Sequence, residues 1–95
     1  LKETNPAQSL SNVQEALGSS LAKGDYFSEA KCYILLGEIN EGIREWALAL
    51  DNYQRALEKL QTNHRLSPQY ARTLAGMASM NLKLGNYQQA IDYYQ

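Results

Sequence analysis

Cysteine and histidine are scarce in this sequence, with one of each among 95 residues. A single cysteine excludes an internal disulfide and favours a reducing compartment, so we expect a cytoplasmic location. Cys32 and His64 cannot supply the set of ligands that a structural zinc site needs, and we expect no metal. Cys32 is interpreted as a small buried hydrophobic residue, and His64 as a solvated residue in a polar loop.

An excess of charge of one sign is also missing. Nine Lys and Arg residues stand against ten Asp and Glu residues, which gives a net charge of −1. Without a basic surface we expect neither nucleic acid nor an anionic membrane as a partner. The longest uncharged apolar run, residues 32–37, is too short to span a bilayer. No signal peptide is visible, and because the chain begins at Leu1 we expect a fragment whose targeting signals lie elsewhere.

Motifs for catalysis are absent as well. The glycines are scattered and form no phosphate-binding loop, and the serines have no neighbouring base. Glu38, Glu41 and Glu45 follow one another at helical spacing, but acid–base chemistry would need them in a pocket, and we interpret them as a solvated face. The many tyrosines could stack on bases only beside a basic groove. We therefore expect no enzyme activity and no cofactor.

The signals that are present belong to helices. Asn5-Pro6 and Ser67-Pro68 each pair an N-cap residue with a proline at the first helical position. Gly24 and Asp25 end one helix and cap the next, and Gly42 marks a weaker boundary. The sequence predicts helices over about 6–23, 26–42, 46–60, 67–84 and from 86 onward, joined as antiparallel neighbours by short connections.

Two of the predicted helices carry marked apolar faces. The face of helix 26–42 is so wide that we expect this helix to pack between two neighbours. Helix 46–60 has the cleanest apolar stripe in the chain, formed by Trp46, Ala49, Leu50, Tyr53, Ala56, Leu57 and Leu60. With 44% hydrophobic and 20% charged residues, the chain has the composition of one small folded domain.

The helices repeat along the chain. A shift of 41 residues places residues 30–54 over 71–95 without a gap, and six of the 25 aligned positions are identical. Chance would give roughly one or two identities. The identical pairs are Ala30/Ala71, Asn40/Asn81, Ala49/Ala90, Asp51/Asp92, Tyr53/Tyr94 and Gln54/Gln95. An internal repeat of two helices indicates helix pairs that bury their apolar faces by stacking.

The repeated residues resemble the signature of the tetratricopeptide repeat (TPR) family. In that family a small residue on the first helix of a pair lets the second helix approach, an alanine on the second helix fills the reciprocal gap, and a large aromatic residue fills the core. These roles would fall to Gly37 and Ala78, to Ala49 and Ala90, and to Tyr53 and Tyr94. The resemblance implies an all-α fold of antiparallel helix pairs stacked as a right-handed superhelix.

The sequence departs from the family pattern at several places. The family's tryptophan position holds Tyr33 and Leu74, its tyrosine position holds Asn40 and Asn81, and Arg44 replaces a turn glycine. The period is 41 rather than about 34 residues, which is similar to the longer repeats of kinesin light chains and bacterial signalling proteins. We expect one domain over 1–95, with an N-terminal helix or partial repeat at 1–29, a first clear repeat at 30–66 and a truncated second repeat at 67–95.

The resemblance also implies a concave groove, lined by helices 26–42 and 67–84, that binds peptide segments. The groove positions carried across are Lys31, Ile34, Leu35 and Glu38 in the first repeat and Arg72, Ala75, Gly76, Ser79 and Lys83 in the second. Lys31 and Arg72 occupy the same place in the two repeats, where they either meet a carboxylate or phosphate or are simply solvated. The family's clamp for C-terminal carboxylates needs asparagines that these positions lack, so we do not expect that ligand.

The function that the resemblance implies is a non-catalytic scaffold that binds a peptide or a partner protein. The alternative is an oligomerisation or sensor segment of a larger multidomain signalling regulator. The last helix ends without a cap, and its apolar stripe of Tyr87, Ala90, Ile91 and Tyr94 predicts a homo-oligomer formed through the C-terminal helix.

Overall fold

The computed structural model describes residues 5–61 and 67–94, and within these ranges the chain is all-α. The helices are α1 (Pro6–Lys23), α2 (Tyr26–Gly42), α3 (Trp46–Leu60), α4 (Pro68–Lys83) and α5 (Tyr87–Tyr94). The predicted fold class is confirmed. His64 and the rest of the 62–66 connection lie outside the described residues, as do the side chains of Tyr87, Ala90 and Tyr94.

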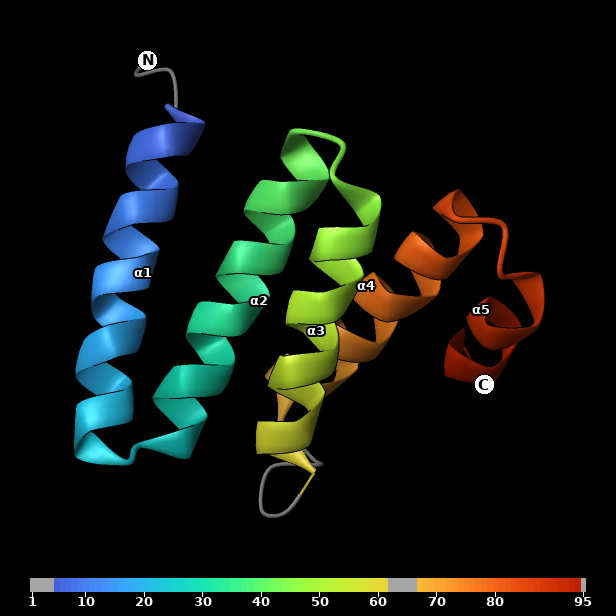
Figure 1. Cartoon of the computed structure of the whole chain (residues 1–95). Coiled ribbons are helices and arrows are strands. Elements are labelled where there is room, and N and C mark those ends of the chain that lie inside the picture. The colour runs from blue at the N-terminus through green and yellow to red at the C-terminus, as the bar shows by residue number, and fades with distance from the viewer. Residues whose placement is uncertain (1–4, 62–66, 95) are drawn as a thin grey trace.

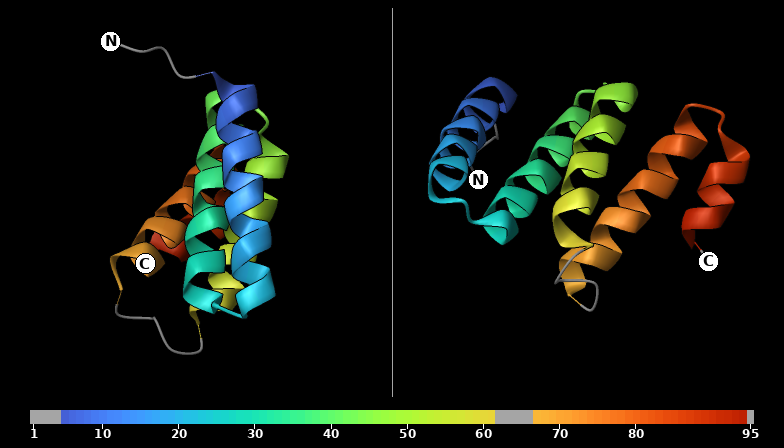
Figure 2. Two further views of the ribbon diagram at one scale, coloured as in Figure 1. Left: turned by 90° about the vertical axis from the view of Figure 1, so that its left-hand side faces the viewer. Right: turned by 60° about the horizontal axis from the view of Figure 1, so that its bottom comes forward.

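The five helices lie side by side in chain order, and consecutive helices run antiparallel (Figure 1). Helix α2 packs against both α1 and α3 and also contacts α4, while α4 packs against α3 and α5. The two views of Figure 2 show the same row of helices from the end and from below. The wide apolar face of α2 is therefore explained, as predicted, by its position between neighbouring helices.

The three helices with predicted N-caps begin where expected. The Asn5 side chain accepts hydrogen bonds from the backbone N–H groups of Ala7 and Gln8, at 3.0 and 3.3 Å. Asp25 accepts from the backbone of Ser28 at 3.1 Å, and hydrogen bonds from Ser28 lower the pKa of its carboxyl. Ser67 caps α4 in the same way. Each cap satisfies donors that the first helical turn leaves unpaired, which stabilises a helix by about 0.5–2 kcal/mol.

One turn geometry occurs three times. The turns after α1, α2 and α4 each contain a residue in the left-handed region: Gly24 (φ 68°), Arg44 (φ 63°) and Gly85 (φ 83°). In each turn the next N–H returns to a carbonyl five residues earlier: Asp25 to Ser20, Glu45 to Asn40 and Asn86 to Asn81, at 3.1, 2.8 and 2.7 Å. The shape of the turn thus recurs after α1, although the sequence there does not fit the 41-residue register. The second turn is centred on Arg44, whereas Gly42 is the last residue of α2.

Tyr53 of α3 is the largest side chain of the core and is 2% exposed. A Cβ atom added to Gly37 of α2 would lie 2.8 Å from the Tyr53 ring, and one added to Gly76 of α4 would lie equally close. Ala49 and Ala56 are fully buried on the same stripe of α3. The roles that the resemblance gave to Gly37, Ala49 and Tyr53 therefore fit the packing. Gly76 was expected in the groove, but it packs on Tyr53 because the ring fills the space beside it.

A buried carboxylate joins α2 to α3 at the other end of this pair. Glu29 is 1% exposed, and its Oε1 lies 3.1 Å from Nζ of Lys59. The ion pair with Glu29 raises the pKa of Lys59, whose ammonium also lies 4.8 Å from the centre of the Tyr26 ring. Cys32 is buried nearby on α2, as predicted, and burial raises the pKa of its thiol.

We predict that Arg44→Gly stabilises the fold by about 1 kcal/mol, because a side chain in the left-handed region is strained and glycine is not. Urea titration of both proteins measures the change. Gly24→Ala is the matched control, since it introduces a Cβ at the left-handed position of the turn after α1, with open space around it, and it should destabilise by a similar amount. Equal stability of Arg44→Gly and the wild type would contradict the strain.

Candidate functional site

A shallow pocket of about 130 Å³ lies between α2 and α4 and is lined by Lys31, Ile34, Leu35, Gln69 and Arg72. Four of these residues are groove positions that the sequence predicts, so the structure brings Lys31, Ile34, Leu35 and Arg72 together. Gln69 was missed. It precedes Arg72 by three residues and therefore lies on the same helix face, a spacing from which it could have been included.

The two aliphatic residues of this pocket have different environments. Ile34 is 1% exposed and belongs to the core, so it forms only the floor of the pocket. Leu35 is 43% exposed and projects an apolar side chain toward solvent. The apolar surface available to a ligand at this position therefore comes from Leu35.

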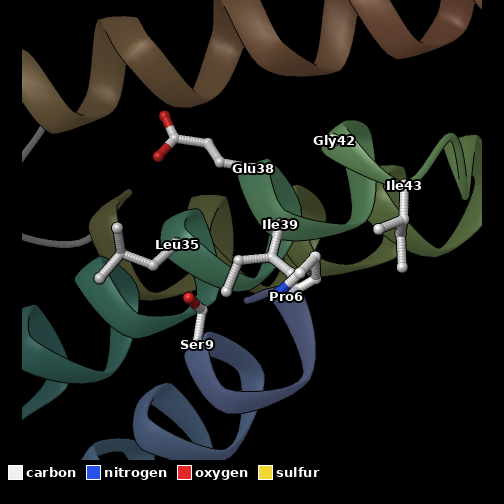
Figure 3. A pocket seen from close by; sticks show the side chains of 7 residues that line it. All are labelled: Pro6, Ser9, Leu35, Glu38, Ile39, Gly42 and Ile43. Atoms are coloured by element: carbon white, nitrogen blue, oxygen red, sulfur yellow. The ribbon is translucent and has the colours of Figure 1, made fainter. Parts of the chain in front are cut away.

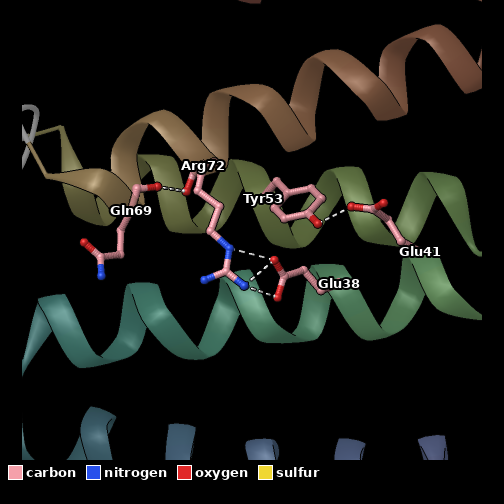
Figure 4. Close-up of polar contacts among 6 residues, drawn as sticks. Glu38, Glu41, Tyr53, Gln69 and Arg72 are labelled. Carbon is pink, nitrogen blue, oxygen red and sulfur yellow. Dashed lines mark hydrogen bonds and ion pairs between the residues drawn. The ribbon is translucent and has the colours of Figure 1, made fainter.

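Arg72 is held by Glu38 across the two helices. Its Nε and Nη2 donate to the two carboxylate oxygens of Glu38 at 2.7 and 2.6 Å, as Figure 4 shows. The pair is largely exposed and stabilises the fold little, but its two parallel bonds fix the plane of the guanidinium. Neither sequence interpretation of Arg72, as solvated or as ligand-facing alone, included this partner. Glu38 was expected on a solvated face, and its side chain is 34% exposed there, but the sequence did not indicate that Arg72 of α4 would be its partner.

Glu41 also has a partner from another helix. The Tyr53 hydroxyl crosses from α3 and donates a hydrogen bond to a carboxylate oxygen of half-buried Glu41 (Figure 4). Burial first, and this hydrogen bond second, raise the pKa of Tyr53 far above the ordinary value of a tyrosine. Glu41 is thus half-buried and has a partner, whereas Glu45 is exposed as expected for a solvated face.

The remaining predicted groove residues lie outside the α2–α4 pocket. Ala75 is exposed and Ser79 is half-buried on α4. The Lys83 ammonium lies 5.5 Å from the centre of the Trp46 ring at the start of α3. The Lys31 ammonium lies 5.0 Å from the Phe27 ring, on its own helix. Lys31 therefore lines the α2–α4 pocket, whereas Lys83 contacts α3.

A second, larger pocket of about 320 Å³ lies between the start of α1 and the end of α2. Pro6 and Ser9 of α1 face Leu35 and Ile39 of α2 across it, as seen in Figure 3. Gly42, Ile43 and Glu38 complete the lining, and the Glu38 carboxylate points away from the apolar side chains toward α4. Leu35, Ile39 and Ile43 follow at i, i+4 and i+8, a stripe that sequence reasoning did not single out, although it assigned Leu35 to the groove.

The opposite face of α2 carries a third pocket, of about 350 Å³, between α1 and α3. Polar and charged side chains contribute much of its lining, among them Gln14, Asn40, Asp51, Asn52 and Arg55. Leu48, which is 50% exposed, lies at this pocket. The exposure of Leu48 is similar to that of Leu35, but Leu48 lies on the other side of the row of helices.

Within residues 5–61 and 67–94, no group of three or more His, Cys, Asp and Glu residues is placed to hold a metal ion. Among the helices described, none is long and apolar enough to cross a membrane.

We predict that stability falls as the pH rises above about 10, the pKa of tyrosine in an unfolded chain. There the unfolded state releases the Tyr53 proton while the folded state retains it, because the folded-state pKa is raised, and unfolding becomes more favourable. In Tyr53→Phe the decline should be shallower and not absent, since the raised pKa of Lys59 acts in the same direction. Urea titrations at about pH 8 and about pH 11 measure it. Equal declines in the two proteins would contradict the prediction.

Comparison with known proteins identifies the repeat. The sequence profile described as tetratricopeptide repeat matches residues 33–95, which include most of α2 and all of α3, α4 and α5. Searches among curated proteins and among solved structures found no significant match. The matched region spans more than half of the chain and covers most of the α2–α3 pair and all of the α4–α5 pair. The chain belongs to the tetratricopeptide repeat family, whose members generally mediate protein–protein interactions.

Proposed function

We propose that the chain is a non-catalytic scaffold that binds a peptide segment of a partner protein on the face formed by α2 and α4. The observation that carries this proposal is the pocket between the two helices, where exposed Leu35 lies beside Lys31 and Arg72. The general role of the family in protein–protein interaction supports it.

The size of this pocket favours a peptide over a small molecule. Sites for cofactors and small substrates enclose about 300–1,000 Å³. The α2–α4 pocket has about 130 Å³ and is suited to one side chain of an extended chain. Lys31 and the guanidinium of Arg72 supply donors at its edge, and Gln69 can donate to and accept from a peptide backbone.

The test compares two exposed leucines on opposite faces. We predict that Leu35→Ala weakens binding of a peptide selected on the wild-type chain by at least about threefold, because apolar contact area is lost. Leu48→Ala, which truncates a leucine of similar exposure on the face between α1 and α3, should leave affinity unchanged. Fluorescence anisotropy gives the affinities, and amide chemical shifts locate the peptide. Loss of binding in Leu48→Ala alone would place the site on the other face and overturn the proposal.

A second candidate function is self-association through the C-terminal part of the chain, as in an oligomerisation or sensor segment of a larger signalling regulator. Three exposed apolar residues favour it: Leu82, Leu84 and Ile91, at 44, 39 and 49% exposure. Apolar groups gathered on one surface often mark an interface. We also propose that the chain is divided into an N-terminal part at 1–29 and two repeats at 30–66 and 67–95, and that these repeats are of the long type found in kinesin light chains and bacterial signalling proteins.

We predict a dimer by sedimentation at concentrations of tens of micromolar, and a monomer after Ile91→Lys, because a charge in the interface lacks a partner. Leu21→Lys is the matched control, since Leu21 is equally exposed but lies on α1. A monomeric wild type at these concentrations would remove this second function and leave the peptide-binding proposal unaffected.

A further inference from the structure

We propose that the pocket between α1 and α2 is a second subsite of the same surface, which takes an aliphatic or aromatic side chain of a peptide that also carries an acidic residue for Lys31 and Arg72. The inference rests on the proposed peptide-binding function and adds the chemistry of the ligand. It also gives α1, which precedes the matched repeats, a direct part in recognition.

The lining of the α1–α2 pocket selects an apolar group. Pro6, Leu35, Ile39 and Ile43 supply carbon surface, and Ser9 is the polar side chain contributed by α1. The carboxylate of Glu38 is turned toward Arg72 and so presents no charge to the interior of the pocket. With a volume of about 320 Å³ the pocket can enclose one large side chain, and removal of its apolar surface from water is favourable.

The charges beside the pocket select an acidic neighbour. The charged residues that line the two pockets are Lys31, Glu38 and Arg72. Because Glu38 neutralises Arg72, the net charge of this lining is the positive charge of Lys31. The fork to Glu38 uses Nε and Nη2 of Arg72, which leaves Nη1 outside this pair and available to a second carboxylate. A peptide carboxylate beside Lys31 and Arg72 is therefore complementary, whereas a basic residue there would be repelled.

Leu35 fixes the spacing between the two ligand groups. It lines both the α1–α2 pocket and the α2–α4 pocket, so the two subsites adjoin on either side of one side chain. An extended peptide rises about 3.3 Å per residue and presents alternate side chains to the same surface. The apolar anchor and the acidic residue of the ligand thus lie within about three positions of each other.

Gly42 provides a way to fill the apolar subsite without disturbing the fold. It lines the pocket at the last position of α2, and an added Cβ would meet nothing within 4 Å. Gly18 of α1 has equally open surroundings and lines none of the pockets described above. Gly42→Leu and Gly18→Leu are therefore matched substitutions, one inside the subsite and one outside it.

The experiment begins with a random peptide library displayed on phage and selected on the whole chain. We expect the selected sequences to share a large apolar residue and an Asp or Glu within about three positions. Affinities of the best peptide are then measured by fluorescence anisotropy, with circular dichroism as the check on folding. Gly42→Leu should weaken binding at least about tenfold because its side chain occupies the subsite, and Gly18→Leu should not change it.

The acidic position is tested by a double-mutant cycle. Replacing the acidic residue of the peptide by its amide should weaken binding about two- to fivefold, the usual range for an exposed ion pair. In Lys31→Gln the same replacement should have a clearly smaller effect, because only Arg72 then faces the acidic residue. In Lys23→Gln, which changes an exposed lysine at the end of α1, the full effect should remain.

The possible failures are distinguishable. Selection of no peptide at all would overturn both the binding function and this inference. Peptides that bind wild type and Gly42→Leu equally, or that lack the apolar–acidic pair, would overturn the inference alone. A wild-type dimer that Gly42→Leu dissociates would show that a second copy of the chain occupies the pocket, and would overturn the peptide assignment as well.

Discussion

The packing of Tyr53 between two glycines is the constraint on which the arrangement of the helices depends. The ring extends from α3 and reaches the backbone of α2 at Gly37 and of α4 at Gly76. Because an added Cβ at either glycine would lie 2.8 Å from the ring, neither helix could carry a side chain at this point without moving away from Tyr53. One side chain thereby sets the separation of three helices, α2, α3 and α4.

The candidate binding surface follows from this separation. Helices α2 and α4 are close enough for Arg72 to reach both oxygens of Glu38, and the pocket with Lys31 and Leu35 lies beside that ion pair. The Tyr53 hydroxyl emerges at the same face and binds Glu41. Core and surface are therefore coupled, because the residue that spaces the helices also orders one of the acidic groups along the proposed groove.

The sequence predicts the helices and the core well because their signals are local. The caps at Asn5, Asp25 and Ser67 and the stripe of α3 each depend on residues within a few positions. The 41-residue repeat also predicted that Lys31 and Arg72 occupy equivalent places.

What the sequence could not predict depends on contacts between distant residues. Glu38 pairs with Arg72 and Glu41 pairs with Tyr53, and no local pattern indicates either pair. The packing of Gly76 against Tyr53 depends on a ring from another helix, and residues near Gly76 in the sequence do not indicate this contact. The apolar pocket needs α1, whose position lies outside the repeat register, so its lining from Pro6 and Ser9 could not be foreseen.

The spacing role of Tyr53 is tested most directly by a double-mutant cycle between Gly76 and Tyr53, in which urea titration gives the free energy of unfolding of each variant. An alanine within a helix is favoured over glycine by up to about 1 kcal/mol, and Gly18→Ala, where the added Cβ meets nothing, should show this gain. Gly76→Ala should instead destabilise by about 1–3 kcal/mol because its Cβ meets the ring. In a Tyr53→Leu background the same change should become neutral or stabilising. A Gly76→Ala variant as stable as Gly18→Ala in the wild-type background would contradict the claim that Tyr53 sets the spacing of the helices.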